Sequence, residues 1–86
     1  MTLKVRSLPN KLISEDKDTI LFYLSEFMID KIKKDRNYFI LALKNDHGNV
    51  LRHLGYFEII RVSRNKKEFG GSGGTHKECE LKRLGI

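Results

Sequence analysis

The most constraining feature of the sequence is the apolar stretch 37–43 (NYFILAL), the longest strongly apolar run in the chain. Its short length, its aromatic start and the charged residues on either side are typical of a strand that is buried on at least one face. Because side chains alternate along a strand, we expect Phe39 and Leu41 to point into the core. Tyr38 and Ile40 should then point to the other face.

Other stretches predict elements that flank or pack on this strand. Residues 3–8 alternate apolar and polar side chains, as a half-buried strand does. Ser14 is a helix-capping residue followed by acidic residues, which predicts a helix over 15–28. The many charges in 29–35 indicate a weak edge strand. Residues 56–64 are rich in β-branched and aromatic side chains, which favours a strand.

The segment 45–55 allows two interpretations. It can form a short helix that is capped by Asp46 and ended by Gly55. It can also form a hairpin, because 46–49 (DHGN) are typical turn residues and 50–54 would return as a strand. The sequence leaves both interpretations open.

These elements predict a small α+β domain with an antiparallel sheet. The long helix would cover one face of the sheet, with a second short helix beside it if 45–55 is helical. The predicted core combines the inward-facing side chains of the strands and the helix. It consists of Leu3, Val5, Ile20, Leu24, Phe27, Phe39, Leu41, Leu43, Ile60 and Val62.

A Gly/Ser segment at 70–74 divides the chain. Such a segment has no side chains to bury and is typical of a flexible linker, either engineered or a natural loop. The sequence therefore predicts a domain over 1–69 and a tail over 75–86. The tail either completes the domain or is a partner peptide tethered to it, since tethering raises the effective concentration of a weak ligand.

Charge and cysteine content limit the class of protein. The 86 residues make one small domain with a net charge of +6, which suits an anionic partner such as RNA, although solubility alone would also explain it. The single Cys79 cannot form an internal disulfide, and no stretch is long and apolar enough to span a membrane. We expect an intracellular protein, cytoplasmic or nuclear, with no membrane partner.

No residue pattern predicts catalysis. His76 and Cys79 stand three residues apart, but a zinc site needs a second pair of ligands, and none has suitable spacing. The acidic residues at 15–18 are explained by the start of the predicted helix. We therefore expect a non-enzyme without a metal, a cofactor or a small-molecule substrate.

Two surfaces are candidates for binding a macromolecule. Basic side chains and one tyrosine on the predicted strands could contact phosphates and a base. These candidate nucleic-acid-binding residues are Lys4, Arg6, Arg36, Tyr38, Arg61 and Arg64. Apolar residues that a sheet-packed helix and a short tail do not need could instead contact a protein partner or a second copy. These candidate partner-binding residues are Leu21, Phe22, Leu81, Leu84 and Ile86.

The order of elements over residues 3–64 resembles the RNA-recognition-motif family. The stretch 3–9 (LKVRSLP) is similar to the family's first-strand motif, including its Leu-Pro ending, and 36–43 (RNYFILAL) is similar to the third-strand motif. Residues 14–28 resemble the first helix, with LSEF at 24–27 in place of the usual aromatic-x-x-Phe. The resemblance implies the ferredoxin-like fold.

The resemblance also bears on function. The family stacks bases on three aromatic positions, which Lys4, Tyr38 and Ile40 occupy in this chain. Members that lose these aromatic residues often bind proteins. We therefore expect a non-catalytic interaction module that binds a protein or oligomerises through the helical face, with single-stranded RNA binding on the basic sheet face as the alternative.

Overall fold

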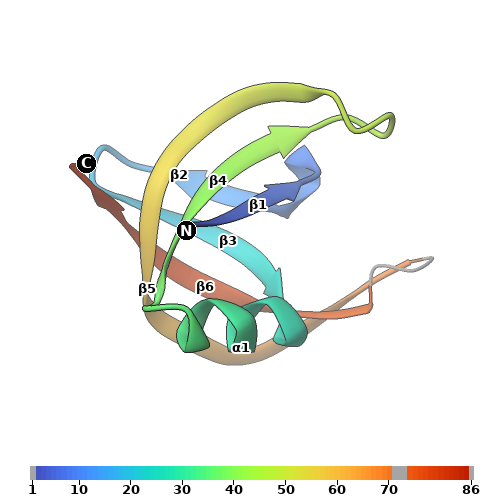
Figure 1. The fold of residues 1–86 in the computed structure, drawn as a ribbon. Coiled ribbons are helices and arrows are strands. Elements are labelled where there is room, and N and C mark those ends of the chain that lie inside the picture. Colours follow the sequence, from blue (N-terminus) through green and yellow to red (C-terminus); the bar gives the residue numbers. More distant parts are fainter. Residues whose placement is uncertain (1, 71–73, 86) are drawn as a thin grey trace.

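A mixed β-sheet dominates the computed structural model, which describes residues 2–70 and 74–85 (Figure 1). The elements, in chain order, are β1 (Leu3–Ser7), the 3₁₀ turn η1 (Pro9–Lys11), β2 (Leu12–Glu15), β3 (Thr19–Ser25), α1 (Glu26–Lys34), β4 (Tyr38–Lys44), β5 (Val50–Phe69) and β6 (Gly74–Leu84). The six strands lie in the order β1-β4-β5-β6-β3-β2. β1 runs parallel to β4, and every other neighbouring pair is antiparallel.

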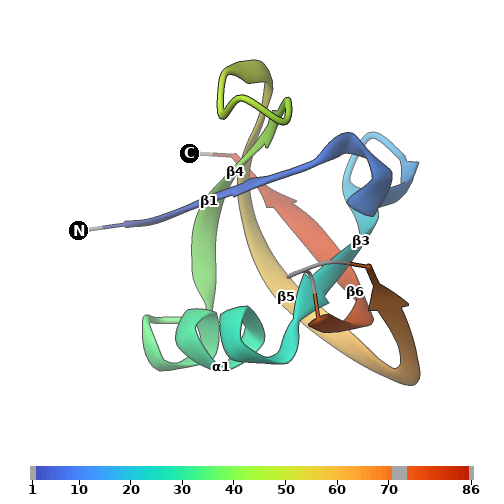
Figure 2. The ribbon, with the colours of Figure 1, turned by 90° about the vertical axis from the view of Figure 1, so that its right-hand side faces the viewer.

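The chain connection forces this sheet to curl. β1 and β2 form opposite edges of the sheet, yet only residues 8–11 join them. Six flat strands would hold the edges about 24 Å apart, since neighbouring strands are spaced by about 4.8 Å. The connection from Ser7 to Leu12 spans about 18 Å at most. The sheet is therefore bent around its core, most visibly along β5 (Figures 1 and 2).

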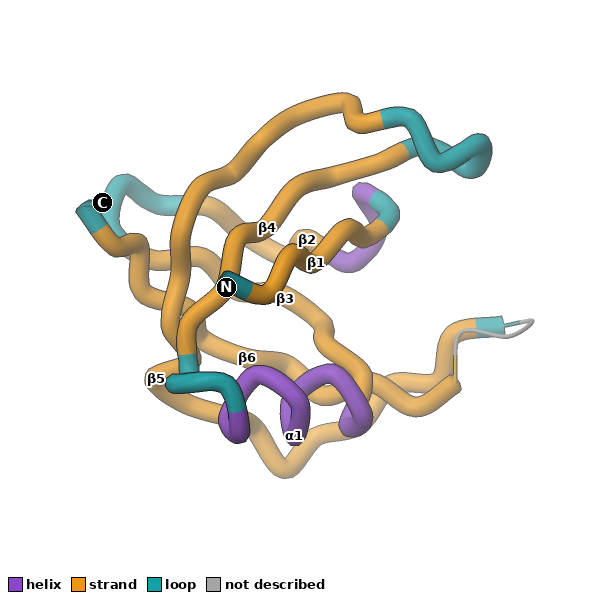
Figure 3. Tube along the Cα trace, in the orientation of Figure 1, coloured by secondary structure: helices purple, strands orange, loops and turns teal. Residues whose placement is uncertain are grey.

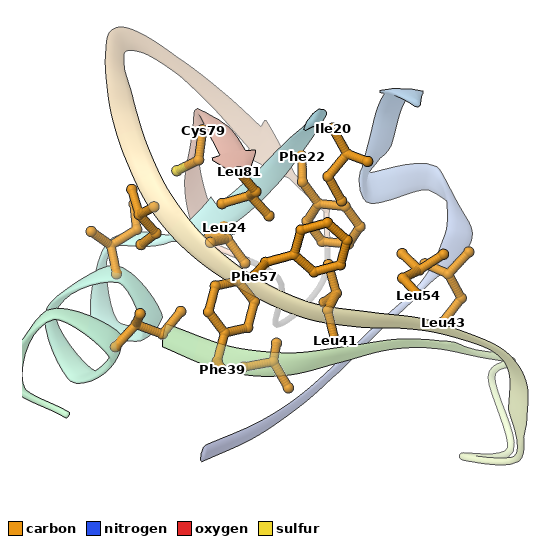
Figure 4. Close-up of a cluster of buried hydrophobic side chains, with 14 residues drawn as sticks. Ile20, Phe22, Leu24, Phe39, Leu41, Leu43, Leu54, Phe57, Cys79 and Leu81 are labelled. Atoms are coloured by element: carbon orange, nitrogen blue, oxygen red, sulfur yellow. The ribbon is translucent and has the colours of Figure 1, made fainter. Parts of the chain in front are cut away.

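The concave side of the curled sheet holds the hydrophobic core (Figure 4). Phe22, Phe39 and Phe57 are fully buried there. Phe39 and Phe57 lie opposite each other on β4 and β5, which places two large rings on the same face. Burial of such side chains contributes about 1.5–3 kcal/mol each before ordering costs. The expected register of 37–43 is confirmed, because Phe39 and Leu41 are buried while Tyr38 and Ile40 are only partly buried.

Helix α1 packs against the sheet where β3 ends and β4 begins (Figure 3). Ser25 caps it, because its Oγ accepts a hydrogen bond from the amide of Met28 at 3.2 Å. Ile29 and Ile32 are the buried residues on the inner face of the helix. Asn37, in the left-handed region with φ 61°, follows the helix and donates from Nδ2 to the carbonyl of Ile59 at 2.9 Å, which ties the turn to β5.

The ferredoxin-like prediction is wrong, because the domain is mostly a six-stranded mixed sheet with one helix of nine residues. The expected helix over 15–28 is largely strand β3, whose side chains alternate between buried and partly buried. Residues 20–24 are all apolar, so they fit both the 3.6-residue period of a helix and the two-residue period of a strand. Pairing with β6 makes this segment a strand. The expected strand over 29–35 lies mostly within α1, where the charged side chains face solvent and Ile29 and Ile32 face the core.

The predicted core is correct except at Phe27 and Ile60. Both are surface residues, 73% and 47% exposed. Phe27 falls in the first turn of α1 on the outer side, and a bulge between Ile59 and Arg61 turns Ile59 inward in place of Ile60. Leu3 and Val62 are partly buried against the core. The other six predicted members are buried, namely Val5, Ile20, Leu24, Phe39, Leu41 and Leu43.

The two ambiguous segments resolve into β structure. Residues 45–49 form the turn of a β4–β5 hairpin, so the helical interpretation of 45–55 is wrong. The tail becomes β6, a central strand between β5 and β3. Of the Gly/Ser segment, residues 71–73 lie outside the described residues, as does Ile86. None of the helices in the described ranges has the length and apolar character to cross a membrane.

Candidate functional site

The predicted nucleic-acid-binding residues do not form one surface. Lys4 and Arg6 are exposed on β1, opposite Ile40 and Ala42 of β4, so they share the outer face with Tyr38. A shallow hollow of ≈220 Å³ lies between Lys4, Arg6 and these two apolar side chains. Lys4, Arg6 and Tyr38 therefore lie on one face of β1 and β4.

The three other arginines lie elsewhere. Arg36 is in the turn after α1 with φ 66°. Arg61 forms an ion pair with Glu80 at 3.1 Å, and Arg64 is exposed where β5 departs from regular pairing with β6. Their charges do not add to the face formed by Lys4 and Arg6.

The predicted partner-binding residues are mainly structural. Phe22 and Leu81 are fully buried on β3 and β6, and Leu21 and Leu84 are partly buried. Ile86 is outside the described residues. Phe22 and Leu81 stabilise the core and are not available to a partner.

A different surface combines charge with a concave shape. Where β1 ends, η1, the β4–β5 turn and β6 converge around a groove of ≈310 Å³. We call it the cationic groove. Its lining residues are Arg6, Ser7, Leu8, Lys11, Lys44, Asn45, Asp46 and His76.

The cations of the groove lack the acidic partners that other cations of the chain have. Within residues 2–70 and 74–85, no ion pair involves Arg6, Lys11 or Lys44. By contrast, Glu26 holds both Lys66 and Lys77 at 3.4 and 3.5 Å. Partial burial, and secondarily the positive charge of Lys44, lower the pKa of Lys11 from its ordinary 10.5. The groove therefore concentrates positive charge that Asp46, the carboxylate in its lining, offsets only in part.

An aromatic cluster adjoins the groove. It consists of Tyr23, Phe69 and His76, with centroid distances of 5.4 Å between Tyr23 and Phe69 and 4.6 Å between Phe69 and His76. Both pairs meet edge to face, a favourable geometry for aromatic rings. Lys11 links the cluster to the groove, because its Nζ lies 4.3 Å from the centre of the Phe69 ring. Lys67 lies 5.3 Å above Tyr23.

His76 is shared by both features. Although it is polar, His76 is buried, 7% exposed, and its Nδ1 lies 3.2 Å from the carbonyl oxygen of Gly74. Burial lowers the pKa of His76 below its ordinary 6.5, and Lys11 acts in the same direction, against the carbonyl of Gly74. His76 is therefore neutral at pH 7.

Two observations concern the groups that a catalytic site could use. Within them no three His, Cys, Asp or Glu side chains are placed to hold a metal ion. Burial raises the pKa of the Cys79 thiol to about 11, so the thiolate needed of a nucleophile is scarce at neutral pH. That the protein is not an enzyme remains a prediction.

Sequence reasoning found Arg6 but missed Lys11, Lys44, Phe69 and His76 as members of one site. They come from η1, β4, β5 and β6, which only the curl of the sheet brings together. The sequence offers only a weak signal, namely that Lys11 follows the turn-forming residues Pro9 and Asn10 and that Lys44 precedes the turn-forming residues 45–49.

Comparisons with known proteins do not identify the chain. No protein-family model, no curated protein and no solved structure matches it. Nothing in them bears on the resemblance to the RNA-recognition motif, which remains a prediction from the sequence.

Proposed function

We propose that the protein binds single-stranded nucleic acid, most simply RNA, through the cationic groove and the adjoining aromatic cluster. The observation that carries this proposal is Lys11, which lines the groove and also lies over the ring of Phe69. A ligand bound along this surface would contact the basic side chains of the groove and, next to them, the ring of Phe69. Single-stranded nucleic acid offers phosphates and bases in that alternation.

Charge supports the phosphate contacts. Arg6, Lys11 and Lys44 converge on one groove, with Asp46 as the opposing carboxylate. Bringing like charges together is unfavourable unless an anion compensates them. Bound phosphates would do so and would release counterions from the strand.

The aromatic cluster supports a base contact. Tyr23 and Phe69 are partly exposed, and Lys67, which lies over both rings, is an exposed side chain. Lys67 can leave the rings without loss of a backbone hydrogen bond. A base stacked on an aromatic side chain contributes about 1–3 kcal/mol to binding and carries little sequence preference.

The test is a fluorescence anisotropy titration of a labelled ten-nucleotide uridine strand at an ionic strength of about 0.1 M, where the Debye length is about 10 Å. The variant Lys11→Gln/Lys44→Gln should bind at least about tenfold more weakly than the original protein, a difference of about 1.4 kcal/mol. The matched control is Lys31→Gln/Lys34→Gln, which removes the same charge from exposed residues in α1. α1 precedes the start of β4, whereas the groove lies at its end.

The control variant should keep the original affinity to within about twofold, because long-range attraction alone is largely screened. Equal weakening by both variants would show attraction by net charge and contradict a specific groove. No binding by the original protein would refute the proposal.

A second candidate is protein binding or homo-oligomerisation through α1. The observation that favours it is Phe27, whose large side chain is 73% exposed in the first turn of the helix. Sedimentation of the original protein and of Phe27→Ala at increasing concentration tests the homo-oligomer. Association that Phe27→Ala abolishes would support it, and a monomer throughout would contradict it.

We propose an intracellular location, cytoplasmic or nuclear, for this binding. The one cysteine is buried as a free thiol, which suits a reducing compartment.

A further inference from the structure

We infer that the cationic groove takes a phosphate monoester, the terminal phosphate of a strand, and that the neighbouring base lies on the aromatic cluster. This inference rests on the proposed function and specifies which part of the strand enters the groove. A terminal phosphate carries a charge of about −1.5 to −2 at pH 7. A phosphodiester within a strand carries a single negative charge.

The charge of the groove fits the monoester better than the diester. Three cations and one carboxylate, with His76 neutral, give the lining a net charge of +2. All of these side chains border one volume of ≈310 Å³, the lower end of the range for small-ligand sites. One diester would leave a cation uncompensated in this volume, whereas one doubly charged monoester balances the groove.

The lining also provides donors of the right kind. Lys11 and Lys44 each offer three N–H donors, and Arg6 can bind two phosphate oxygens at once with its planar fork. Ser7 adds a hydroxyl, and the side chain of Asn45 already accepts hydrogen bonds from His47 and Asn49, which fixes the β4–β5 turn beside the groove. A monoester presents three terminal oxygens to such donors, one more than a diester presents.

The position of the aromatic cluster explains where the strand continues. Lys11 contacts Phe69, so a phosphate at Lys11 would place its own nucleoside next to the ring. The remainder of the strand can then leave past Tyr23 and Lys67, which are not part of the groove lining. Either a 5′ or a 3′ terminal phosphate could supply this chemistry.

The experiment compares three ten-nucleotide uridine strands that carry the same internal label. One has a 5′ phosphate, one has a 3′ phosphate, and one has hydroxyl groups at both ends. We expect one phosphorylated strand to bind about tenfold more tightly than the hydroxyl strand, since a charge-assisted, multidentate contact is gained. Which strand gains affinity identifies the end that is bound.

Two variants test whether the increase in affinity due to the terminal phosphate arises in the groove. Lys11→Gln/Lys44→Gln should reduce the gain to less than about twofold, and Lys31→Gln/Lys34→Gln should preserve it. Circular dichroism is used to check that both variants are folded. A gain that survives in the groove variant would place the terminal phosphate elsewhere and overturn the inference.

The experiment distinguishes failure of the terminal-phosphate inference from failure of the proposed single-strand binding. Equal binding of all three strands by the original protein would overturn the terminal-phosphate inference and leave the proposed binding of single strands intact. Absence of binding to every strand would overturn both.

Discussion

Two clusters of basic side chains in this protein lie in opposite surroundings. One is the closing cluster, Glu15, Arg52 and Arg83, where Arg52 lies 2.5 Å and Arg83 3.6 Å from the carboxylate of Glu15. The other is the cationic groove, whose Arg6, Lys11 and Lys44 take part in no ion pair within the described residues. The contrast separates arginines that join strands through carboxylate and carbonyl acceptors from cations that have no acidic partner within the described residues.

The closing cluster stabilises the curled sheet by joining strands that are not neighbours in the sheet order. β2 and β5 are separated by two strands in the sheet order, yet Glu15 and Arg52 join them. Arg83 donates from Nη1 to the carbonyl of Leu54 and from Nε to that of Lys17 at 3.2 Å. Its guanidinium also lies 4.8 Å from the centre of the buried Phe57 ring.

Substitution of Arg83 should produce the largest change in stability. Arg83→Ala removes two hydrogen bonds from a charged donor, an ion pair and a cation–π contact. Because the side chain is still 32% exposed, we expect a loss of about 2–3 kcal/mol in the free energy of unfolding. Urea denaturation measures it, with Arg64→Ala as the control that should stay within about 0.5 kcal/mol. A loss below that limit for Arg83→Ala would show that the cluster does not hold the sheet.

Gly55→Ala should have the next largest effect. Gly55 has a φ of 119°, which L side chains rarely adopt, and an added Cβ would lie 3.2 Å from Nη1 of Arg83. We expect a loss of about 1–3 kcal/mol from backbone strain and displacement of the guanidinium. In the Arg83→Ala background the loss should be smaller, because only the strain remains. A double-mutant cycle with additive losses would rule out this contact as a cause.

Acidification should weaken the fold through His76. Burial lowers the pKa of this imidazole, so between the unfolded value near 6.5 and the lower folded value the unfolded state binds more protons. The stability due to neutral His76 is therefore complete above pH 6.5 and is lost as the pH falls toward the folded pKa. Urea midpoints at pH 7.5 and 5.5 should decline more for the original protein than for His76→Gln. Equal declines would contradict this linkage.

Removal of charge from the groove should change stability least. Burial and Lys44 both disfavour the charged form of Lys11, so Lys11→Gln/Lys44→Gln relieves repulsion while it loses the contact with Phe69. The two effects should leave the free energy of unfolding within about 0.5 kcal/mol of the original. A loss comparable to that of Arg83→Ala, measured in the same urea series, would show that the groove is structural.

The sequence predicts secondary structure correctly where a segment is compatible with only one element. The run 37–43 is bounded by charged residues, which limits it to the length of a strand, and Phe39, Leu41 and Leu43 share the face that packs into the core. The prediction failed at 15–35, because 20–24 are apolar at every position and both Ser14 and Ser25 can cap a helix. Pairing of Ile20 with Leu81, sixty-one positions away in the chain, decides the outcome, and no local pattern records it.

The site was less accessible from the sequence than the core. Arg6 was found because it alternates outward on a recognisable strand. Lys11, Lys44 and His76 approach one another only after the sheet curls, and the curl depends on the short connection between β1 and β2. Charge count indicated an anionic partner, but the location of the excess charge required the tertiary structure.

The salt dependence of single-strand binding tests the central claim most directly, because it counts the phosphate contacts. The logarithm of the association constant falls with the logarithm of salt concentration by about 0.7 for each contact on a single strand. Lys11→Gln/Lys44→Gln should therefore reduce this slope by about 1.4, whereas Lys31→Gln/Lys34→Gln should leave it unchanged. Identical slopes for the groove variant and the original protein would contradict the account, because the phosphates would then be bound elsewhere.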